Sequence, residues 1–227
     1  SADGSVGFTR LADGEILSRR SLRPEGATLT SVSAEGTGSD ALALGFSDGS
    51  ASVVDVAYRY DLSSRQRRII PVLAQPLGEA PLAATRKQPV HALALDLQAG
   101  VLARQYDSGV LEIARIPPQA DVGAPRWENL GRQPVAASLL LMDAGRWLVL
   151  LTAEGDYQAW PLSKTVAGTP RAGRLFPPGE SLTAATLLQG ALSLVAASEN
   201  GALNRYYLLR GGILAPVHGF NTAGMVP

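Results

Sequence analysis

The stretch Leu42-Ala-Leu-Gly-Phe-Ser-Asp-Gly-Ser-Ala-Ser-Val-Val-Asp-Val56 decides the fold of this 227-residue chain. Large and small apolar residues alternate up to Phe46, Asp48-Gly49 follows, and a β-branched run comes after the glycine. Glycine accepts a positive φ without a steric penalty, and aspartate hydrogen-bonds the backbone two residues on. The stretch therefore predicts a β-hairpin with its turn at Asp48-Gly49.

Four further hairpins of the same kind are predicted along the chain. Each has an apolar strand, an acidic residue or asparagine close to a glycine, and a second strand that is more polar. They lie at Val6–Leu17, Val101–Ile113, Trp147–Trp160 and Leu192–Tyr206. Their turn glycines, at positions 14, 49, 109, 155 and 201, are separated by 35, 60, 46 and 46 residues. The first two intervals together span about two of the later ones, so the sequence indicates a repeat of about 46 residues.

A second marker repeats in phase with the hairpins. Lys87-Gln88-Pro89-Val90 and Arg132-Gln133-Pro134-Val135 stand 45 residues apart, and each opens an apolar strand. The apolar spacing stays near two, and Gly and Pro recur too often for a long amphipathic helix. We therefore predict an all-β fold, a β-propeller of about five four-stranded blades, with residues 1–227 as a single domain.

The hairpins resemble those of WD40-type repeats, in which a strand, an Asp-Gly turn and a strand ending near Trp-Asp recur. Ser47-Asp48-Gly49 through Val54-Asp55, and Glu154-Gly155 through Trp160-Pro161, are the nearest matches. Elsewhere Ala114-Arg115 and Tyr206-Tyr207 replace the Trp-Asp pair, and the Gly-His dipeptide is absent. The resemblance covers nearly the whole chain and implies the propeller shape, without the hydrogen-bonded tetrad of regular WD40 blades.

The polar residues of each second hairpin strand predict the outer edge of a blade. We expect Glu112, Arg115 and Gln158 on an outer strand that faces water, where charge discourages aggregation between sheet edges. We also expect the ring to close within the chain, with Ile213–Val217 pairing beside Val6–Leu17 to complete the first blade. The alternative is a larger ring with further blades outside these residues.

The long interval between the second and third hairpins predicts an irregular insertion at Tyr58–Lys87. It holds a basic run from Arg65 to Arg68. A solvated loop is the simplest interpretation of such a run, and the alternative is contact with phosphate, lipid head groups or an acidic partner. Arg65, Arg67 and Arg68 are therefore the candidate partner-contact residues.

Composition excludes several classes of function. Lys plus Arg and Asp plus Glu both number 20, so no field of one sign attracts nucleic acid. The absence of cysteine removes disulfides, thiolate catalysis and cysteine-based zinc sites. Val135–Ala153 is apolar and about as long as a membrane span, but Asp143, Gly145 and Arg146 predict a turn between two buried strands. We expect contact with a membrane only through segments outside these residues.

No catalytic constellation stands out. Gly45-Phe46-Ser47-Asp48-Gly49 matches the Gly-x-Ser-x-Gly pattern of hydrolases, but that pattern needs a helix after the serine, and a strand is predicted here. His91 opens an apolar strand and is expected to be a hydrogen-bonded structural residue. No acidic cluster has metal-ligand spacing. The sequence therefore predicts no enzyme, no cofactor and no metal.

The function predicted from the sequence is a non-catalytic interaction or sensory propeller. Its overall character resembles the extracytoplasmic propeller of bacterial ABC transporter permeases of the phosphate-uptake type, although no permease motif occurs in this stretch. That resemblance implies a periplasmic location, with transporter subunits or a substrate-binding protein as partners. The alternatives are a periplasmic lipoprotein-type scaffold, a cytoplasmic scaffold, and a ligand-binding or hydrolytic propeller enzyme with polar groups at the axis.

Overall fold

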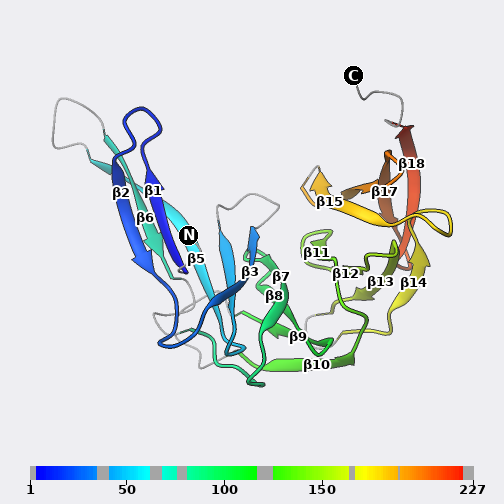
Figure 1. Cartoon of the computed structure of the whole chain (residues 1–227), viewed down its shortest axis with the longest axis horizontal. Coiled ribbons are helices and arrows are strands. Elements are labelled where there is room, and N and C mark those ends of the chain that lie inside the picture. The colour runs from blue at the N-terminus through cyan, green and yellow to red at the C-terminus, as the bar shows by residue number, and fades with distance from the viewer. Residues whose placement is uncertain are drawn as a thin grey trace.

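The structure, a computed structural model, describes residues 4–34, 41–61, 68–75, 81–116, 125–163, 167–188 and 190–221. These residues form four four-stranded sheets and one two-stranded sheet. Figure 1 shows the sheets side by side in an open arc, with the N-terminal hairpin at one end and the last sheet at the other. The all-β propeller architecture predicted from the sequence is thus confirmed.

The strands follow one another in chain order. The N-terminal hairpin contains β1 (Ser5–Thr9) and β2 (Ile16–Ser21). Blade 1 contains β3 (Leu29–Ala34), β4 (Leu42–Phe46), β5 (Ala51–Asp61) and β6 (Arg68–Ala74). Blade 2 contains β7 (Val90–Asp96), β8 (Val101–Tyr106), β9 (Val110–Arg115) and β10 (Trp127–Arg132). Blade 3 contains β11 (Ser138–Met142), β12 (Trp147–Leu151), β13 (Asp156–Pro161) and β14 (Arg171–Arg174). Blade 4 contains β15 (Leu182–Leu188), β16 (Ser193–Ser198), β17 (Ala202–Leu209) and β18 (Ile213–Asn221).

Every blade is an antiparallel meander in which each strand pairs with the next one along the chain. All five predicted hairpins are present, as β1–β2, β4–β5, β8–β9, β12–β13 and β16–β17. The β1–β2 turn lies on the opposite face of the arc from the connection to blade 1, because that turn precedes β2 and the connection follows it. Strand direction alternates, so the turns inside the other four hairpins lie on the same face of the arc as the connections between blades. We call this side the turn face.

The two repeating sequence markers meet on the turn face. Gly49 has φ +86°, and a Cβ there would lie 2.1 Å from the Arg86 carbonyl oxygen and 2.8 Å from that of Gln88. Gly109, at φ +80°, would place a Cβ 2.5 Å from the Gln133 carbonyl oxygen, and its own carbonyl accepts the Gln133 N–H at 2.9 Å. Gly49 and Gly109 therefore each pack directly against the Gln-Pro-Val connection that opens the next blade.

Apolar side chains fill the seams between neighbouring blades. Ala43 and Val53 of blade 1 pack with Leu102 and Tyr106 of blade 2. Blades 2 and 3 share a larger core that includes the buried Trp160. A third core joins blade 3 to blade 4, and a fourth joins the N-terminal hairpin to blade 1. Trp160 and Tyr206 are buried in two of these cores.

The outer edge of each blade differs from the prediction. The second hairpin strand is only the third strand of its blade, because β10, β14 and β18 pair outside it. Glu112 is accordingly 3% exposed rather than solvent-facing. In the predicted irregular insertion, residues 68–74 form the regular strand β6, which pairs with an unusually long β5.

The apolar stretch Val135–Ala153 folds as predicted, into two strands rather than a membrane span. β11 and β12 are joined by a turn in which Asp143, Ala144 and Gly145 have φ values of 57°, 52° and 68°. In the part of the chain that the structure describes, no helix is both long and apolar enough to cross a bilayer.

The predicted closure of the ring is wrong. β18 pairs with β17 and completes blade 4, while β1 pairs with β2 alone. Val6 and Phe8 of β1 pack against the blade 1 core, at the opposite end of the arc from β18 (Figure 1). Because every blade takes its fourth strand from its own repeat, the C-terminal strand is not free to complete the first one.

Candidate functional site

An open groove crosses the turn face at blade 3. It comprises a cavity of about 620 Å³ and an adjoining one of about 450 Å³, both of which touch Pro134 and Glu154. The wider part is lined by the ends of β12, β13 and β14, and the narrower part by the connection that opens β11. The remaining lining residues are His91, Val135, Ala136, Ala137, Thr152, Ala153, Asp156, Tyr157, Gln158, Ala172 and Gly173. We call this the blade 3 groove.

Hydrogen bonds from buried side chains hold the walls of the groove. Gln105 Nε2 donates to the Pro134 carbonyl at 2.7 Å, and its Oε1 accepts the Ala136 N–H at 2.8 Å. Gln105 is fully buried, so these bonds are shielded from water. On the opposite wall, the Tyr157 hydroxyl accepts the Leu214 N–H of β18 at 3.1 Å. Buried side chains thus hold both the connection before β11 and the start of β13, which form the two walls of the groove.

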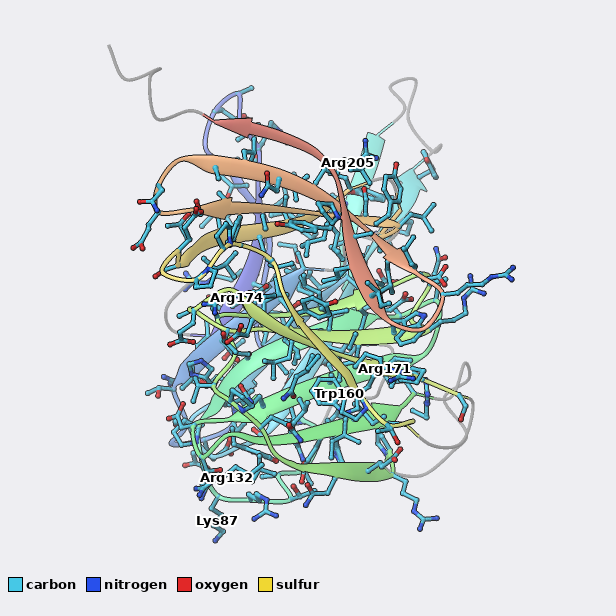
Figure 2. The ribbon with its side chains drawn as sticks, turned by 90° about the vertical axis from the view of Figure 1, so that its right-hand side faces the viewer. Lys87, Arg132, Trp160, Arg171, Arg174 and Arg205 are labelled. Atoms are coloured by element: carbon cyan, nitrogen blue, oxygen red, sulfur yellow. The ribbon has the colours of Figure 1, made fainter. Side chains whose placement is uncertain are left out.

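The groove combines an apolar lip with negative charge. Val135 is 51% exposed, and it follows Pro134 directly. Glu154 and Asp156 are exposed on the other side. Arg174 Nη2 donates to the Glu154 backbone carbonyl at 2.9 Å, and its Nε lies 3.6 Å from Asp156 Oδ1. Figure 2 places Arg174 toward the same side of the molecule as Lys87 and Arg132, whereas Arg171 lies toward the opposite side.

His91 serves the fold, as predicted. Its Nε2 lies 3.0 Å from the Ala136 carbonyl of the next blade, so a neutral imidazole carries its proton on this nitrogen. Nδ1 lies 3.4 Å from Asp107 Oδ1 and forms an ion pair when the ring is protonated. With both nitrogens directed at the protein, the ring bridges blades 2 and 3.

Ser47 is also a structural residue. Its Oγ accepts the Thr28 N–H at 2.9 Å, and its own N–H donates to the Thr28 carbonyl at 2.9 Å. Asp48 Oδ1 accepts both the N–H and the hydroxyl of Ser50, at 2.9 and 2.6 Å. A strand follows, so the serine lacks the helix that a hydrolase nucleophile needs.

A buried charge cluster between blades 1 and 2 was missed by the sequence analysis. Arg104 is fully buried and donates to Glu112 Oε2 from Nε at 3.2 Å and from Nη2 at 3.0 Å. Its guanidinium also lies 3.5 Å from the centroid of the Trp127 ring. Thr85 donates to the Glu112 carboxylate at 2.7 Å from the loop before blade 2. Arg104 and Glu112 could be found in the sequence as opposite charges on two neighbouring predicted strands. Charged residues on a strand, however, usually indicate a solvent-exposed sheet edge.

Arg104 also ties blade 2 to the backbone of blade 1. Its Nη1 donates to the carbonyls of Gly49 and Ala83 at 3.1 and 3.3 Å. Burial lowers the pKa of Arg104, and the neighbouring Tyr106 and Glu112 oppose that shift. Burial likewise raises the pKa of Tyr106, whose ring lies beside the guanidinium. The charges of Arg104 and Glu112 are thus compensated inside the seam between blades 1 and 2.

A small cavity with both polar and apolar lining residues lies between the innermost strands of the arc. It has a volume of about 120 Å³ between the first strands of the four blades and is lined by Ser33, Ala34, Ala94, Leu95, Asp96, Leu141, Thr186 and Leu187. Asp96 is its one carboxylate, and Oδ1 of that residue accepts the Ala99 N–H at 2.7 Å. Over the residues that the structure describes, no three His, Asp or Glu side chains gather as metal ligands would.

The three candidate contact residues of the basic run contribute nothing to this site. Arg65 and Arg67 lie outside the described residues. Arg68 begins β6 in blade 1, and its side chain also lies outside the described part. Their contact with a partner stays a prediction.

Comparison with known proteins identifies the fold. No family model and no curated protein matches the chain. A chain in the crystal structure of the Mitotic Checkpoint Complex superposes with a TM-score of 0.57 at 15% identity, over 98% of this chain and 59% of that one. The β-propeller domain of Myceliophteria thermophila Cps50 (Swd1) superposes with a TM-score of 0.59 at 13% identity, over 97% and 66% respectively. The chain thus has a WD40-like propeller fold and spans about two thirds or less of these neighbours.

Proposed function

We propose that this chain is a non-catalytic protein-interaction module that binds its partner at the blade 3 groove. The observation that supports the proposal is the groove itself, in which the exposed Val135 lies in a connection held by buried hydrogen bonds and faces the acidic end of the β12–β13 hairpin. Interaction surfaces of this kind combine an apolar contact with polar groups that set orientation.

The chemistry of the groove suggests what the partner presents. Pro134 and Val135 offer an apolar contact, while the exposed carboxylate of Glu154, which lines both cavities, favours a neighbouring group that is positively charged or donates hydrogen bonds. Asp156 already has Arg174 as its counter-charge. An extended peptide segment with an apolar side chain next to Lys or Arg fits both demands. The reactive candidates Ser47 and His91 are engaged in structural hydrogen bonds, which favours binding over catalysis.

A photo-crosslinking experiment in the source organism tests the proposal. A photoreactive phenylalanine at position 135 is expected to give one defined protein adduct after irradiation. The matched control position is Leu192, which is 52% exposed against 51% for Val135 but lies between β15 and β16 on the other face. The purified partner should then bind the Glu154→Arg variant about tenfold more weakly, with the melting temperature unchanged.

Two results would contradict this assignment. The same adducts in the same yield from positions 135 and 192 would mean that no partner binds preferentially at the groove. Unchanged affinity of the Glu154→Arg variant would mean that the acidic side of the groove takes no part in binding.

A more specific proposal concerns the identity of the partner and the cellular compartment in which the chain binds it. The resemblance in sequence character to phosphate-type ABC transporter permeases suggests a periplasmic domain that contacts transporter subunits or a substrate-binding protein. That resemblance alone supports it. On this proposal, protease added to intact spheroplasts digests the domain, whereas a cytoplasmic scaffold stays protected until the cells are lysed.

A further inference from the structure

The last blade presents an apolar sheet face that no other blade covers. Leu209 and Ile213 form a cross-strand pair on this face, 48% and 54% exposed. Val195, Leu203 and Tyr207 lie on the same face and are half-buried. We call it the outer face of blade 4.

Strand alternation fixes which side chains belong to the outer face. Leu194, Ala196, Tyr206 and Leu214 pack into the core shared with blade 3. Their neighbours along β16, β17 and β18 must point the other way, because successive side chains of a strand alternate between faces. The outer face therefore consists of residues that the blade 3 contact does not use.

The repeat shows what these positions do in the other blades. Val195 and Leu203 occupy the same repeat positions as Val149 and Tyr157 of blade 3, 46 residues earlier, and as Ala103 and Leu111 of blade 2. All four of those equivalents are 5% exposed or less, because the following blade covers them. The outer face of blade 4 thus continues a surface that is a blade-to-blade contact everywhere else in the chain.

Arg205 does not prevent such a contact. Its Nε donates to Ser193 Oγ at 3.2 Å, and its Nη2 donates to the Tyr207 hydroxyl at 2.7 Å. The guanidinium lies 4.8 Å from the centroid of the Tyr207 ring. Figure 2 labels Arg205 on this end of the molecule. The seam between blades 1 and 2 already buries an arginine held by side chains of its own blade, namely Arg104.

We propose that the outer face of blade 4 is a packing surface for a further four-stranded blade of the same polypeptide, outside residues 1–227. This chain superposes on 59% and 66% of its two structural neighbours, so each of those chains has sequence beyond the superposed part. A second copy fits less well. A two-fold contact centred on β17 would set Arg205 opposite its counterpart, and a head-to-tail contact would meet Gly7, Thr9 and Arg19, which alternate with the core-facing residues of the N-terminal hairpin.

Carbene footprinting of the polypeptide as it is translated in the source organism tests this inference. Compared with residues 1–227 alone, Leu209 and Ile213 are expected to be labelled about tenfold less in the complete product. Ile213→Asp should restore labelling of Tyr207 in the complete product and leave the melting temperature of residues 1–227 unchanged. The matched control is Leu11→Asp, since Leu11 is fully exposed at the tip of the N-terminal hairpin.

Three results would overturn the inference. One is a gene whose coding sequence ends at Pro227. Another is equal labelling of Leu209 and Ile213 in the two polypeptides. The third is protection of residues 1–227 that rises with protein concentration and coincides with a dimer in sedimentation velocity, which would assign the face to a second copy. The turn face takes no part in any of these measurements, so they are independent of binding at the blade 3 groove.

Discussion

Arg104 and Glu112 carry a high desolvation cost, because both charges are removed from water between blades 1 and 2. Their hydrogen bonds to Thr85 and to the backbone of blade 1 compensate that cost. A buried pair of this kind adds little net stability while intact, but removal of one partner leaves the other charge uncompensated.

Glu112→Gln should therefore lower the free energy of unfolding by roughly 3 kcal/mol, since it leaves Arg104 buried without a counter-charge. Urea denaturation followed by tryptophan fluorescence measures the change. The control is Asp156→Asn, which removes the same charge from an exposed pair with Arg174 and should cost less than about 1 kcal/mol. Equal effects of the two substitutions would mean that burial of Arg104 carries no special penalty.

Sequence reasoning located the individual turn residues better than the individual charges. Asp48-Gly49 and His91 occupy the structural roles that local chemistry predicts, because turn geometry and strand-end hydrogen bonding depend on near neighbours. Glu112 was misassigned because its burial depends on Arg104, on Thr85 and on the strand β10 that lies outside it. Those partners come together only through the pairing of strands that local pattern does not specify.

At the scale of the element, the hairpin turn is shaped by the connection that packs on it. Gly14 and Gly49 both have positive φ, at 74° and 86°. A Cβ on Gly14 meets nothing within 4 Å, whereas one on Gly49 would overlap the Arg86 carbonyl oxygen. Glycine is therefore required at position 14 only by the positive φ. At position 49 it is also required by the close packing between blades 1 and 2.

Gly14→Ala should cost about 1–2 kcal/mol, the penalty of an L-residue in the left-handed region. Gly49→Ala should cost at least about 2 kcal/mol more, because the connection must shift away from the new methyl group. Thermal unfolding of both variants measures the difference. Similar melting temperatures would show that the connection yields freely and that Gly49 serves the turn alone.

The hairpins could be predicted from sequence, but the fourth strands could not. A hairpin joins two neighbouring segments through a turn with its own chemistry, so alternation and Asp-Gly identify it. β6, β10, β14 and β18 include short or polar strands, such as Arg171–Arg174, whose pairing comes from the adjacent strand rather than from their own pattern. The blade 3 groove was equally hidden, because it arises where residues from three strands and a connection converge.

At the scale of the molecule, the count of repeats was predictable and the closure was not. A period near 46 residues follows from the spacing of the turn glycines, and the described residues contain four of the roughly five predicted four-stranded blades, with two strands, β1 and β2, in place of the fifth. Closure depends on whether the first and last sheets meet in space, which no local sequence signal reports. The uncovered outer face of blade 4 and the two-stranded N-terminal hairpin form the two ends of the open arc (Figure 1).

An open arc of blades also has consequences for cooperativity. Every strand pairs with a sequence neighbour, and each blade packs only against the adjacent ones, so coupling runs along the chain as in a linear repeat array. Blade 2 has neighbours on both faces, whereas blade 4 and the N-terminal hairpin have a neighbour on one face. We expect native-state hydrogen exchange to show graded opening, with amides of β16 and β17 exchanging at least about tenfold faster than those of β8 and β9. A single opening free energy for all strands would contradict this gradient. In residues 1–227, the cooperative unit of unfolding is thus expected to be the blade, and melting should proceed inward from the two ends.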